Sequence, residues 1–172
     1  MLTREPGGTV TGERIRALIL DPGLVGLDPR AETLLLLAAR AQHVAEVIAP
    51  ALEAGRDVVC DRFSGSTVAY QGYGRGLDPA QLARLSAWAS AGVEPDRVVL
   101  LRTSGAVVAG RLARRDQGID RMEGEGTAFF TKVDEGYAAL AAADPLRWRV
   151  VDGGGTEDEV AARVVAAARP AD

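Results

Sequence analysis

Several residue types that define whole classes of proteins are scarce in this chain of 172 residues. One cysteine, Cys60, is too few for an internal disulfide, and one histidine, His43, is too few for a multi-histidine metal site. These counts exclude a disulfide-stabilised secreted scaffold and a zinc enzyme. Lys132 is the single lysine among 20 basic residues, and no glycine-rich loop precedes it. The chain as given therefore carries no phosphate-binding loop of the Gly-Lys-Ser/Thr type.

Long apolar runs and an excess of positive charge are also missing. The longest apolar run, Leu34 to Ala39, is far shorter than the ~20 residues that span a bilayer. The residues after Met1 do not resemble a signal peptide. Because the formal net charge is -4, we expect no general attraction to nucleic acid or to an anionic membrane. The expectation is a cytoplasmic protein without nucleic-acid or membrane partners.

What the sequence does contain is an alternation of helical patterns and short apolar runs. One long helix is expected to carry Leu34, Leu37, Ala41, Val44 and Ile48 on one face and Leu36, Arg40 and His43 on the neighbouring face. Short apolar runs predict parallel strands at residues 57–60, 97–101 and 147–151. Strands separated by helices indicate an α/β layer fold with a mostly parallel sheet, in one domain over residues 1–172. Helices are predicted before residues 21–22, over residues 29–55 with a kink or restart at Pro50, from Pro79, from Ser104 to about Arg115, up to residues 144–145, and after a capping box of Thr156 and Glu159.

In folds of this kind, ligands bind beyond the carboxyl ends of the strands, and three such segments stand out. Residues 3–9 are Thr-Arg-Glu-Pro-Gly-Gly-Thr, residues 61–67 are Asp-Arg-Phe-Ser-Gly-Ser-Thr, and residues 151–155 are Val-Asp-Gly-Gly-Gly. The first two place an acid beside an arginine, whose planar fork of donors suits phosphate oxygens, and their glycines permit close backbone approach. Salt bridges on ordinary surface turns are the alternative interpretation of each pair.

A further group of arginines spans a predicted helix end and the loop after it. A solvated helix face would explain such a run. The acids around Gly118 also fit a flap that closes and brings positive charge to a phosphoryl group. If these arginines form one phosphate-binding site, Arg4, Arg62 and the arginines of the flap must converge on a single anionic ligand. The group consists of Arg111, Arg114, Arg115 and Arg121.

These motifs, in this order, resemble the signatures of bacterial thymidylate kinases. They are residues 3–9, then Asp61-Arg62 with Ser-Thr-Val-Ala-Tyr-Gln-Gly at residues 66–72, then Asp-Arg-Met-Glu at residues 120–123. The resemblance extends from Leu2 to about Val165. It implies the P-loop nucleoside monophosphate kinase fold and an enzyme of nucleotide biosynthesis that transfers the γ-phosphoryl group of MgATP to dTMP, giving dTDP and ADP. It also implies a homodimer and a lid at about residues 114–126.

The resemblance further assigns roles to single residues. Packing is the alternative role for Tyr70, and a snorkelling surface position is the alternative for Arg40. His43 and Cys60 are expected to be structural. The implied catalytic residues are Asp61, Arg62, Arg115 and Arg121, with Asp61 and Glu5 near Mg²⁺. The implied dTMP-binding residues are Arg4 at the phosphate, Glu5 near the sugar, Leu36, Arg40, Ser66 and Thr67 at the base, and Tyr70 and Gln71 along the sugar. On the ATP side the resemblance implies Arg114, Asp152 and Gly153.

The chain departs from the family pattern in two places. Most members have an aromatic ring one helical turn before the thymine-binding arginine, where this chain has Leu36, and the lost stacking is worth on the order of 1 kcal/mol. Family chains also begin with a strand, a glycine-rich loop with its lysine, and a helix, whereas here Met1 directly precedes Leu2. That strand lies centrally in the family sheet, between the strands that lead to Asp61 and Leu101. We therefore expect this chain to lack both the central strand and the cradle for the ATP phosphates.

Three functional interpretations remain open. The first is an amino-terminally shortened thymidylate kinase that is active in its full-length form, so that these residues alone bind dTMP weakly or not at all and have no kinase activity. The second is a degenerate, non-catalytic nucleotide-binding paralogue. The third, suggested by Leu36, is a related nucleoside monophosphate kinase with altered base choice.

Overall fold

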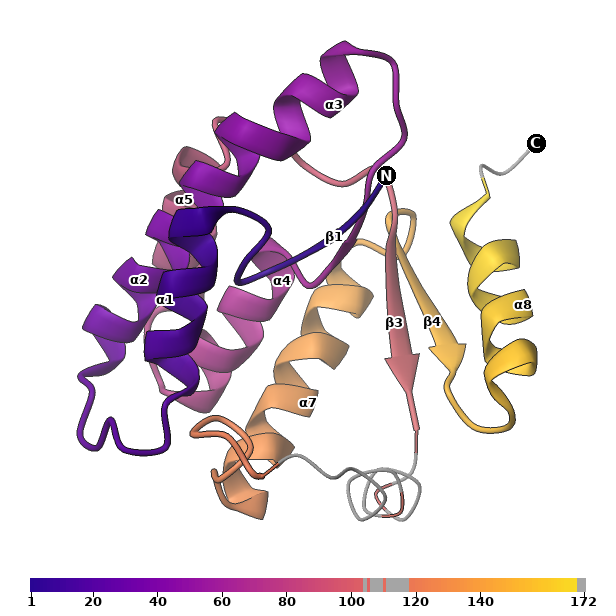
Figure 1. Cartoon of the computed structure of the whole chain (residues 1–172). Helices are drawn as coiled ribbons and strands as arrows, with labels where there is room; N and C mark the ends of the chain where they lie inside the picture. The colour runs from indigo at the N-terminus through magenta and orange to yellow at the C-terminus, as the bar shows by residue number, and fades with distance from the viewer. Residues whose placement is uncertain (104, 106–109, 111–117, 170–172) are drawn as a thin grey trace. The chain divides into compact units, whose positions relative to one another are not determined.

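The computed structural model describes residues 1–103, 105, 110 and 118–169 (Figure 1). It divides into two compact units, one of Met1–Glu94 with Ile119–Tyr137 and one of Pro95–Gly118 with Ala138–Asp172. In both units the strands that pair are parallel, and helices separate the strands along the chain. The α/β class with parallel strands that the sequence predicts is therefore confirmed.

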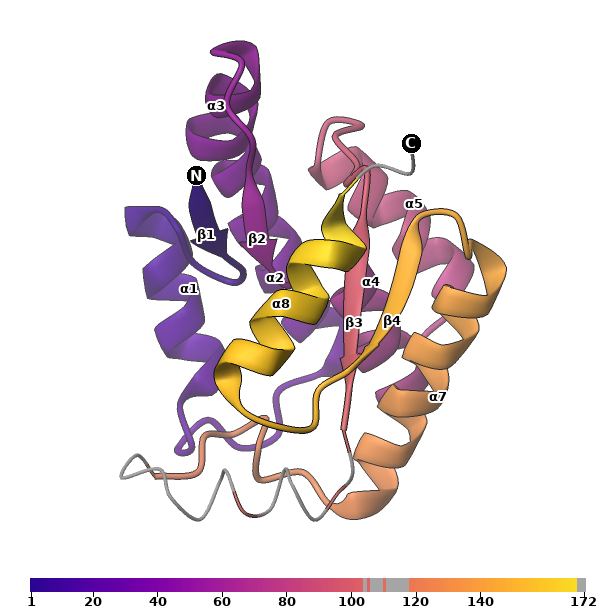
Figure 2. The same cartoon turned by 90° about the vertical axis from the view of Figure 1, so that its right-hand side faces the viewer.

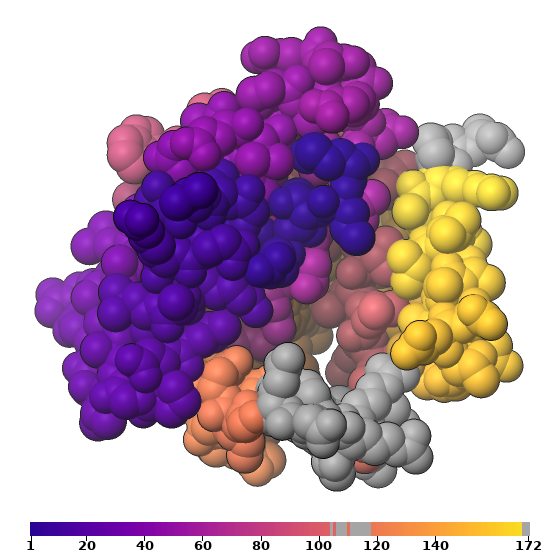
Figure 3. Space-filling model, viewed as in Figure 1, coloured from indigo at the N-terminus to yellow at the C-terminus, as the bar shows by residue number. Residues whose placement is uncertain are grey.

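The first unit contains a short two-stranded sheet. Strand β1 (Leu2–Arg4) pairs in parallel with β2 (Val59–Asp61), with Leu2 opposite Val59 and Arg4 opposite Asp61. The side chains of Leu2 and Val59 are 80% and 64% exposed, and the amino-terminal residues lie on the surface in the space-filling view (Figure 3). Strand β2 lies slightly later than the predicted residues 57–60. Strand β1 was given no range, because three residues are too few to show an alternating pattern, and it includes Thr3 and Arg4, which were expected just beyond a strand end.

Helices make up most of the first unit. Proline at the first turn and an aspartate cap begin two of them, at Asp28-Pro29 and Asp78-Pro79, and Thr9 caps a third. Helix α1 packs on α2, and α2 packs on α5. The helical segment over residues 64–74 was not predicted. The elements are α1 (Val10–Leu20), α2 (Pro29–His43), the π-helical turn η1 (Val44–Ile48), α3 (Ala49–Glu53), α4 (Ser64–Thr67), the π-helical η2 (Val68–Gly74), α5 (Pro79–Ala89) and the beginning of α7 (Thr127–Ala143).

The continuous stretch from α2 to α3 is the core helix of this unit. Pro29–Glu53 has 25 residues, and an 18-residue stretch of it has a mean hydropathy of 1.3, so by length and composition alone it could cross a membrane. However, its polar residues Glu32, Arg40 and His43 are 0 to 3% exposed and are paired with other side chains of the unit. Such pairing is what a buried helix of a folded domain requires. Leu34 is 63% exposed whereas Leu37 is 4% exposed, so the apolar face that contains both is not buried over its whole length.

The second unit contains the other parallel pair. Strand β3 (Val98–Arg102) pairs with β4 (Trp148–Asp152) over five residues, each strand one residue later than predicted. Helix α8 (Glu157–Ala168) packs against both strands (Figure 2). Its predicted capping box is confirmed, since Thr156 and Glu159 exchange hydrogen bonds. The predicted helix from Ser104 to about Arg115 falls mostly outside the described residues.

The described strands thus form two separate sheets of two strands each. No backbone ladder joins β1–β2 to β3–β4 within the part of the chain that the structure describes.

Candidate active site

The two arginine motifs meet at the carboxyl ends of β1 and β2. The backbone N–H of Glu5 donates to the carbonyl oxygen of Asp61 at 2.9 Å, directly after the Arg4–Asp61 rung of the ladder. Arg62 follows with a φ of 65°, in the left-handed region. A non-glycine residue in this region carries strain of about 1–3 kcal/mol, and such strain clusters at functional sites. The structure therefore brings Arg4 and Arg62 to neighbouring strand ends.

The loop after β1 is held against the core helix. Gly8 has a φ of +78°, and a Cβ atom at this position would lie 2.6 Å from Nε2 of His43. The N–H of Gly8 donates to the Glu13 carboxylate at 2.9 Å, and Nη2 of Arg4 donates to the same carboxylate at 2.9 and 3.0 Å. Arg4 is thus about half exposed and paired with Glu13, not with its neighbour Glu5.

Behind this loop lies a buried guanidinium. Arg40, 3% exposed, donates Nε to Glu5 at 2.9 Å, Nη2 to the Thr67 hydroxyl at 3.0 Å and Nη1 to the Ser86 hydroxyl at 3.2 Å. The Phe63 ring packs over it, with its centroid 5.1 Å from the guanidinium carbon. A snorkelling surface position for Arg40 is therefore wrong. Nη2 also lies 2.9 Å from Oε2 of Glu5, so these contacts leave one N–H, on Nη1, for another acceptor.

Glu5 is fixed from two sides. Its Oε2 accepts from Arg40, and its Oε1 lies 3.3 Å from Nδ1 of His43, whose Nε2 lies 2.7 Å from the Thr3 hydroxyl. His43 is fully buried, which agrees with a structural role. Because both carboxylate oxygens of Glu5 are already paired, Glu5 is poorly suited to bind a metal ion.

An aromatic cluster surrounds Arg62. The Tyr70 ring centroid lies 5.0 Å from its guanidinium carbon. Tyr70 also packs edge-on against Phe129 at 6.0 Å and Tyr137 at 6.3 Å. The Tyr137 hydroxyl lies 2.8 Å from Oγ of Ser66 and 3.4 Å from Nη1 of Arg62. Tyr70 is therefore both a packing residue and a direct neighbour of Arg62.

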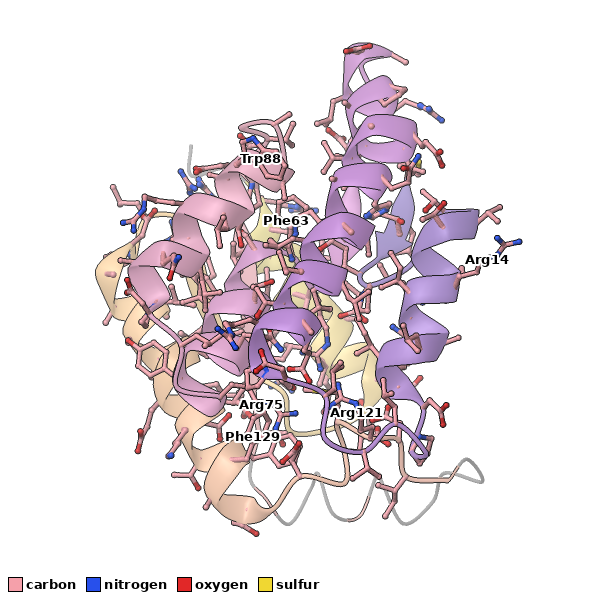
Figure 4. The ribbon with its side chains drawn as sticks, turned by 90° about the vertical axis from the view of Figure 1, so that its left-hand side faces the viewer. Arg14, Phe63, Arg75, Trp88, Arg121 and Phe129 are labelled. Atoms are coloured by element: carbon pink, nitrogen blue, oxygen red, sulfur yellow. The ribbon has the colours of Figure 1, made fainter. Side chains whose placement is uncertain are left out.

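A second buried carboxylate, Glu32, anchors the segment that contains Arg121. Glu32 is 0% exposed and accepts from Gln71 at 2.8 Å, from Arg75 at 3.2 Å and from Arg121 at 2.5 Å. Arg75, Arg121 and Phe129 gather near the start of α2 (Figure 4). Burial by itself would raise the pKa of Glu32, but the hydrogen bonds from these donors outweigh burial and lower it.

Two residues that were predicted to contact the ligands, Gln71 and Arg121, are instead bound to Glu32 in this structure. Gln71 is 1% exposed and its amide is bound to Glu32, so in this conformation it lines no accessible wall beside a sugar. Arg121 donates to the backbone oxygen of Ile19 at 2.7 Å and to Glu32, which holds it on the ends of α1 and α2. Arg114 and Arg115 lie outside the described residues.

The predicted convergence of arginines is thus only partly visible. Arg4 and Arg62 lie at adjacent strand ends, whereas Arg121 is bound to Glu32 in the same unit. Asp152 and Gly153 belong to the second unit, where the N–H of Gly153 donates to the Arg102 carbonyl at 2.7 Å. The role of Asp152 and Gly153 beside ATP therefore stays a prediction.

The sequence interpretation missed Glu32, Arg75, Ser86 and Tyr137. A signal for Glu32 was available, because it precedes Leu36 and Arg40 at intervals of four residues and so shares their helix face. A charge on the inner side of an apolar helix calls for a partner.

The described residues offer neither a cluster of metal ligands nor a reactive thiol. Among the described residues, no group of three or more His, Cys, Asp or Glu side chains is placed to hold a metal ion. Burial, together with the charges of Glu5 and Asp61, raises the pKa of Cys60 to about 12. This thiol is therefore protonated at neutral pH, in agreement with a structural role.

Comparisons with known proteins identify the family. A family model for thymidylate kinase matches residues 1–164. The chain is 51% identical over 168 residues to a thymidylate kinase of Solidesulfovibrio magneticus, covering 94% of this chain and 80% of that protein. A thymidylate kinase of Pelotomaculum thermopropionicum is 50% identical over 166 residues, with 96% and 77% covered. The crystal structure of thymidylate kinase from Ehrlichia chaffeensis matches with a TM-score of 0.76 at 29% identity, covering 96% of this chain and 79% of that chain.

The resemblance read from the motifs at residues 3–9, 61–72 and 120–123 is thereby confirmed, and with it the P-loop type of α/β fold. The chain belongs to the thymidylate kinase family.

Proposed function

We propose that the protein is a dTMP kinase, which transfers the γ-phosphoryl group of MgATP to dTMP and releases dTDP and ADP, in the cytoplasm and as a homodimer. The observation that carries the proposal is the junction of the two arginine motifs at Glu5 and Asp61, in a chain that matches the family over residues 1–164. Thymidylate as the acceptor is taken from the name that the relatives share, thymidylate kinase.

In this proposal the chemistry depends on positioning and charge. Arg4 and Arg62 bind the acceptor phosphate and the transferring group, where positive charge favours an in-line displacement. Arg40 presents the remaining N–H of Nη1 to the base, and its contacts with Glu5, Thr67 and Ser86 hold the side chain in place before the nucleotide binds. Binding then costs little additional side-chain entropy.

The donor set suits Mg²⁺ at Asp61 and not at Glu5. Mg²⁺ is usually held by one or two carboxylates together with substrate phosphates. Asp61 is exposed at the end of β2, whereas both Glu5 oxygens are paired with Arg40 and His43. We therefore assign only Asp61 to the ion, which when bound would neutralise negative charge on the phosphates.

The ATP phosphates require a cradle that these residues do not supply. The chain covers 80% and 77% of the two bacterial relatives, and its strands form two separate pairs. Our proposal is that a preceding segment supplies the phosphate loop and the strand between the pairs, so that both units belong to one kinase domain. Residues 114–126, with Arg114, Arg115 and Arg121, would then form its lid, and Asp152 and Gly153 would border the adenine.

The test is a coupled ADP-release assay with a panel of deoxynucleoside monophosphates. It is run on the product of the whole gene and on residues 1–172 alone. We expect turnover with dTMP from the former and none from the latter. Turnover by the 172 residues would overturn our account of the phosphate loop. Binding of dTMP without turnover by any form would indicate the non-catalytic paralogue, and preference for another monophosphate would indicate altered base choice.

A further inference from the structure

The Tyr137 hydroxyl contacts two residues of the proposed dTMP site, although the family motifs give it no role. Tyr137 lies on α7, and its oxygen is 2.8 Å from Ser66 Oγ and 3.4 Å from Arg62 Nη1. Its ring also packs edge-on against Tyr70, with an interplanar angle of 79°. All three neighbours come from residues 62–70, so one side chain of α7 spans that segment.

Donor chemistry fixes the direction of one of these two hydrogen bonds. An arginine can only donate, so Nη1 of Arg62 donates to the Tyr137 oxygen. The single phenol proton is then available for Oγ of Ser66, and burial, which raises the pKa of Tyr137, keeps that proton in place. Either oxygen of the Ser66–Tyr137 pair can donate; when the phenol donates, the hydroxyl proton of Ser66 points toward another acceptor.

We propose that Tyr137 is a positioning residue of the dTMP site: its hydroxyl orients Arg62 and fixes Ser66 as a hydrogen-bond donor to an acceptor oxygen of the bound nucleotide. The inference rests on the proposed dTMP kinase function. It adds a consequence for specificity, because a fixed donor favours a base edge that carries carbonyl oxygens over one that carries an amino group. Tyr137 should therefore contribute to preference for dTMP over dCMP.

The first test is Tyr137→Phe, which removes the hydroxyl and keeps the ring. Tyr73→Phe is the matched control, because Tyr73 lies on η2 against Gly136 of α7 and is outside the site. In the product of the whole gene, we expect Tyr137→Phe to lower kcat/KM for dTMP about 5- to 10-fold, the scale of one hydrogen bond. KM for ATP should stay constant, the ratio of dTMP to dCMP turnover should fall, and Tyr73→Phe should change none of these.

A double-mutant cycle with Ser66→Ala tests whether Tyr137 influences dTMP binding through Ser66. If Tyr137 acts through Ser66, the two substitutions together should raise KM for dTMP little more than Ser66→Ala alone. The remaining loss, through Arg62, should appear in kcat. Fully additive effects on KM, or equal kinetics for Tyr137→Phe and Tyr73→Phe, would overturn the inference.

A second measurement does not depend on turnover. In proton NMR spectra of the 172-residue chain at low temperature, the Tyr137 hydroxyl proton should exchange slowly, disappear in Tyr137→Phe, and show a nuclear Overhauser effect to the Ser66 β-protons. A rapidly exchanging hydroxyl would overturn the inference even if dTMP turnover is normal. Absence of dTMP turnover in the unmodified protein would instead overturn the proposed function, while the NMR result still decides the hydrogen-bond direction.

Discussion

The backbone N–H of Glu5 donates to the carbonyl oxygen of Asp61 at 2.9 Å. This bond extends the β1–β2 ladder by one step and joins two motifs that are 56 residues apart in the sequence. Because the strands are parallel, both motifs leave the sheet at the same edge. The pairing of β1 with β2 therefore places the backbones of Arg4 and Arg62 close together, independently of the partners that their side chains bind.

From this arrangement we predict unequal losses at Arg62 and Thr67. In the product of the whole gene, Arg62→Ala should lower kcat for dTMP about 100- to 1,000-fold, because it removes charge that meets the transferring group. Thr67→Ala removes one of three protein partners of Arg40 and should cost less than about tenfold, the scale of one hydrogen bond. Steady-state kinetics of both variants measure the difference, and equal losses would contradict the separate roles.

Local signals in the sequence were enough to predict most helices. The aspartate–proline pairs at residues 28–29 and 78–79 and the box of Thr156 and Glu159 define helix starts by chemistry within four residues. Residues 64–74 carry no such signal, and Gly65, Gly72 and Gly74 argue against a helix there. That helix was missed because tertiary packing against α5 stabilises it.

The buried polar clusters could not be predicted in the same way. Arg121 and Glu32 are 89 residues apart, and Arg40 and Ser86 are 46 apart. Motif matching assigned Arg40, Gln71 and Arg121 to ligand contacts, but it contains no information on which protein groups they bind. The distances along the chain explain why the partners became known only from the fold.

Glycine at position 8 should be far less replaceable than glycine at position 26. Both have nearly the same backbone, with φ of +78° and +76°, but only at Gly8 would a Cβ meet other atoms, those of His43 at 2.6 Å. Gly26→Ala should therefore cost about 1–2 kcal/mol of unfolding free energy from backbone strain. Gly8→Ala should cost about 2 kcal/mol more, because the His43 ring must move. Urea denaturation measures both, and similar losses would contradict the close contact.

Replacing the Glu32 carboxylate should destabilise the fold. Glu32→Gln removes the buried carboxylate that Arg75 and Arg121 share and leaves Arg75 paired with Glu125 alone, and we expect a loss of about 3 kcal/mol in unfolding free energy. Glu135→Gln, at an exposed position of α7, is the matched control and should change stability by less than about 0.5 kcal/mol. A loss for Glu32→Gln no larger than that of the control would show that the cluster is not stabilising.

The Glu32 contribution should also depend on pH in a defined direction. The pKa of Glu32 is lowered in the folded protein from an ordinary value of 4.5, so the unfolded chain takes up this proton first. The stability it provides is present above the unfolded pKa and is lost as the pH falls through the folded pKa. The difference in unfolding free energy between the unmodified protein and Glu32→Gln should stay constant between roughly pH 6 and pH 7. Below about pH 4.5 this difference should become smaller. A difference that grows on acidification would reverse the assigned sign.

A ring at position 36 should strengthen dTMP binding. Leu36 is half-buried and lies one turn before Arg40 on α2, on the helix face that we propose for the base. Leu36→Phe restores a stacking surface, and because such stacking is worth about 1 kcal/mol, dTMP should bind about fivefold more tightly. Leu34→Phe, on the same helix but 63% exposed, adds the same ring away from the base and should leave affinity unchanged. Calorimetric titration with dTMP distinguishes them, and equal affinities for both variants would mean that the base does not lie over this turn of α2.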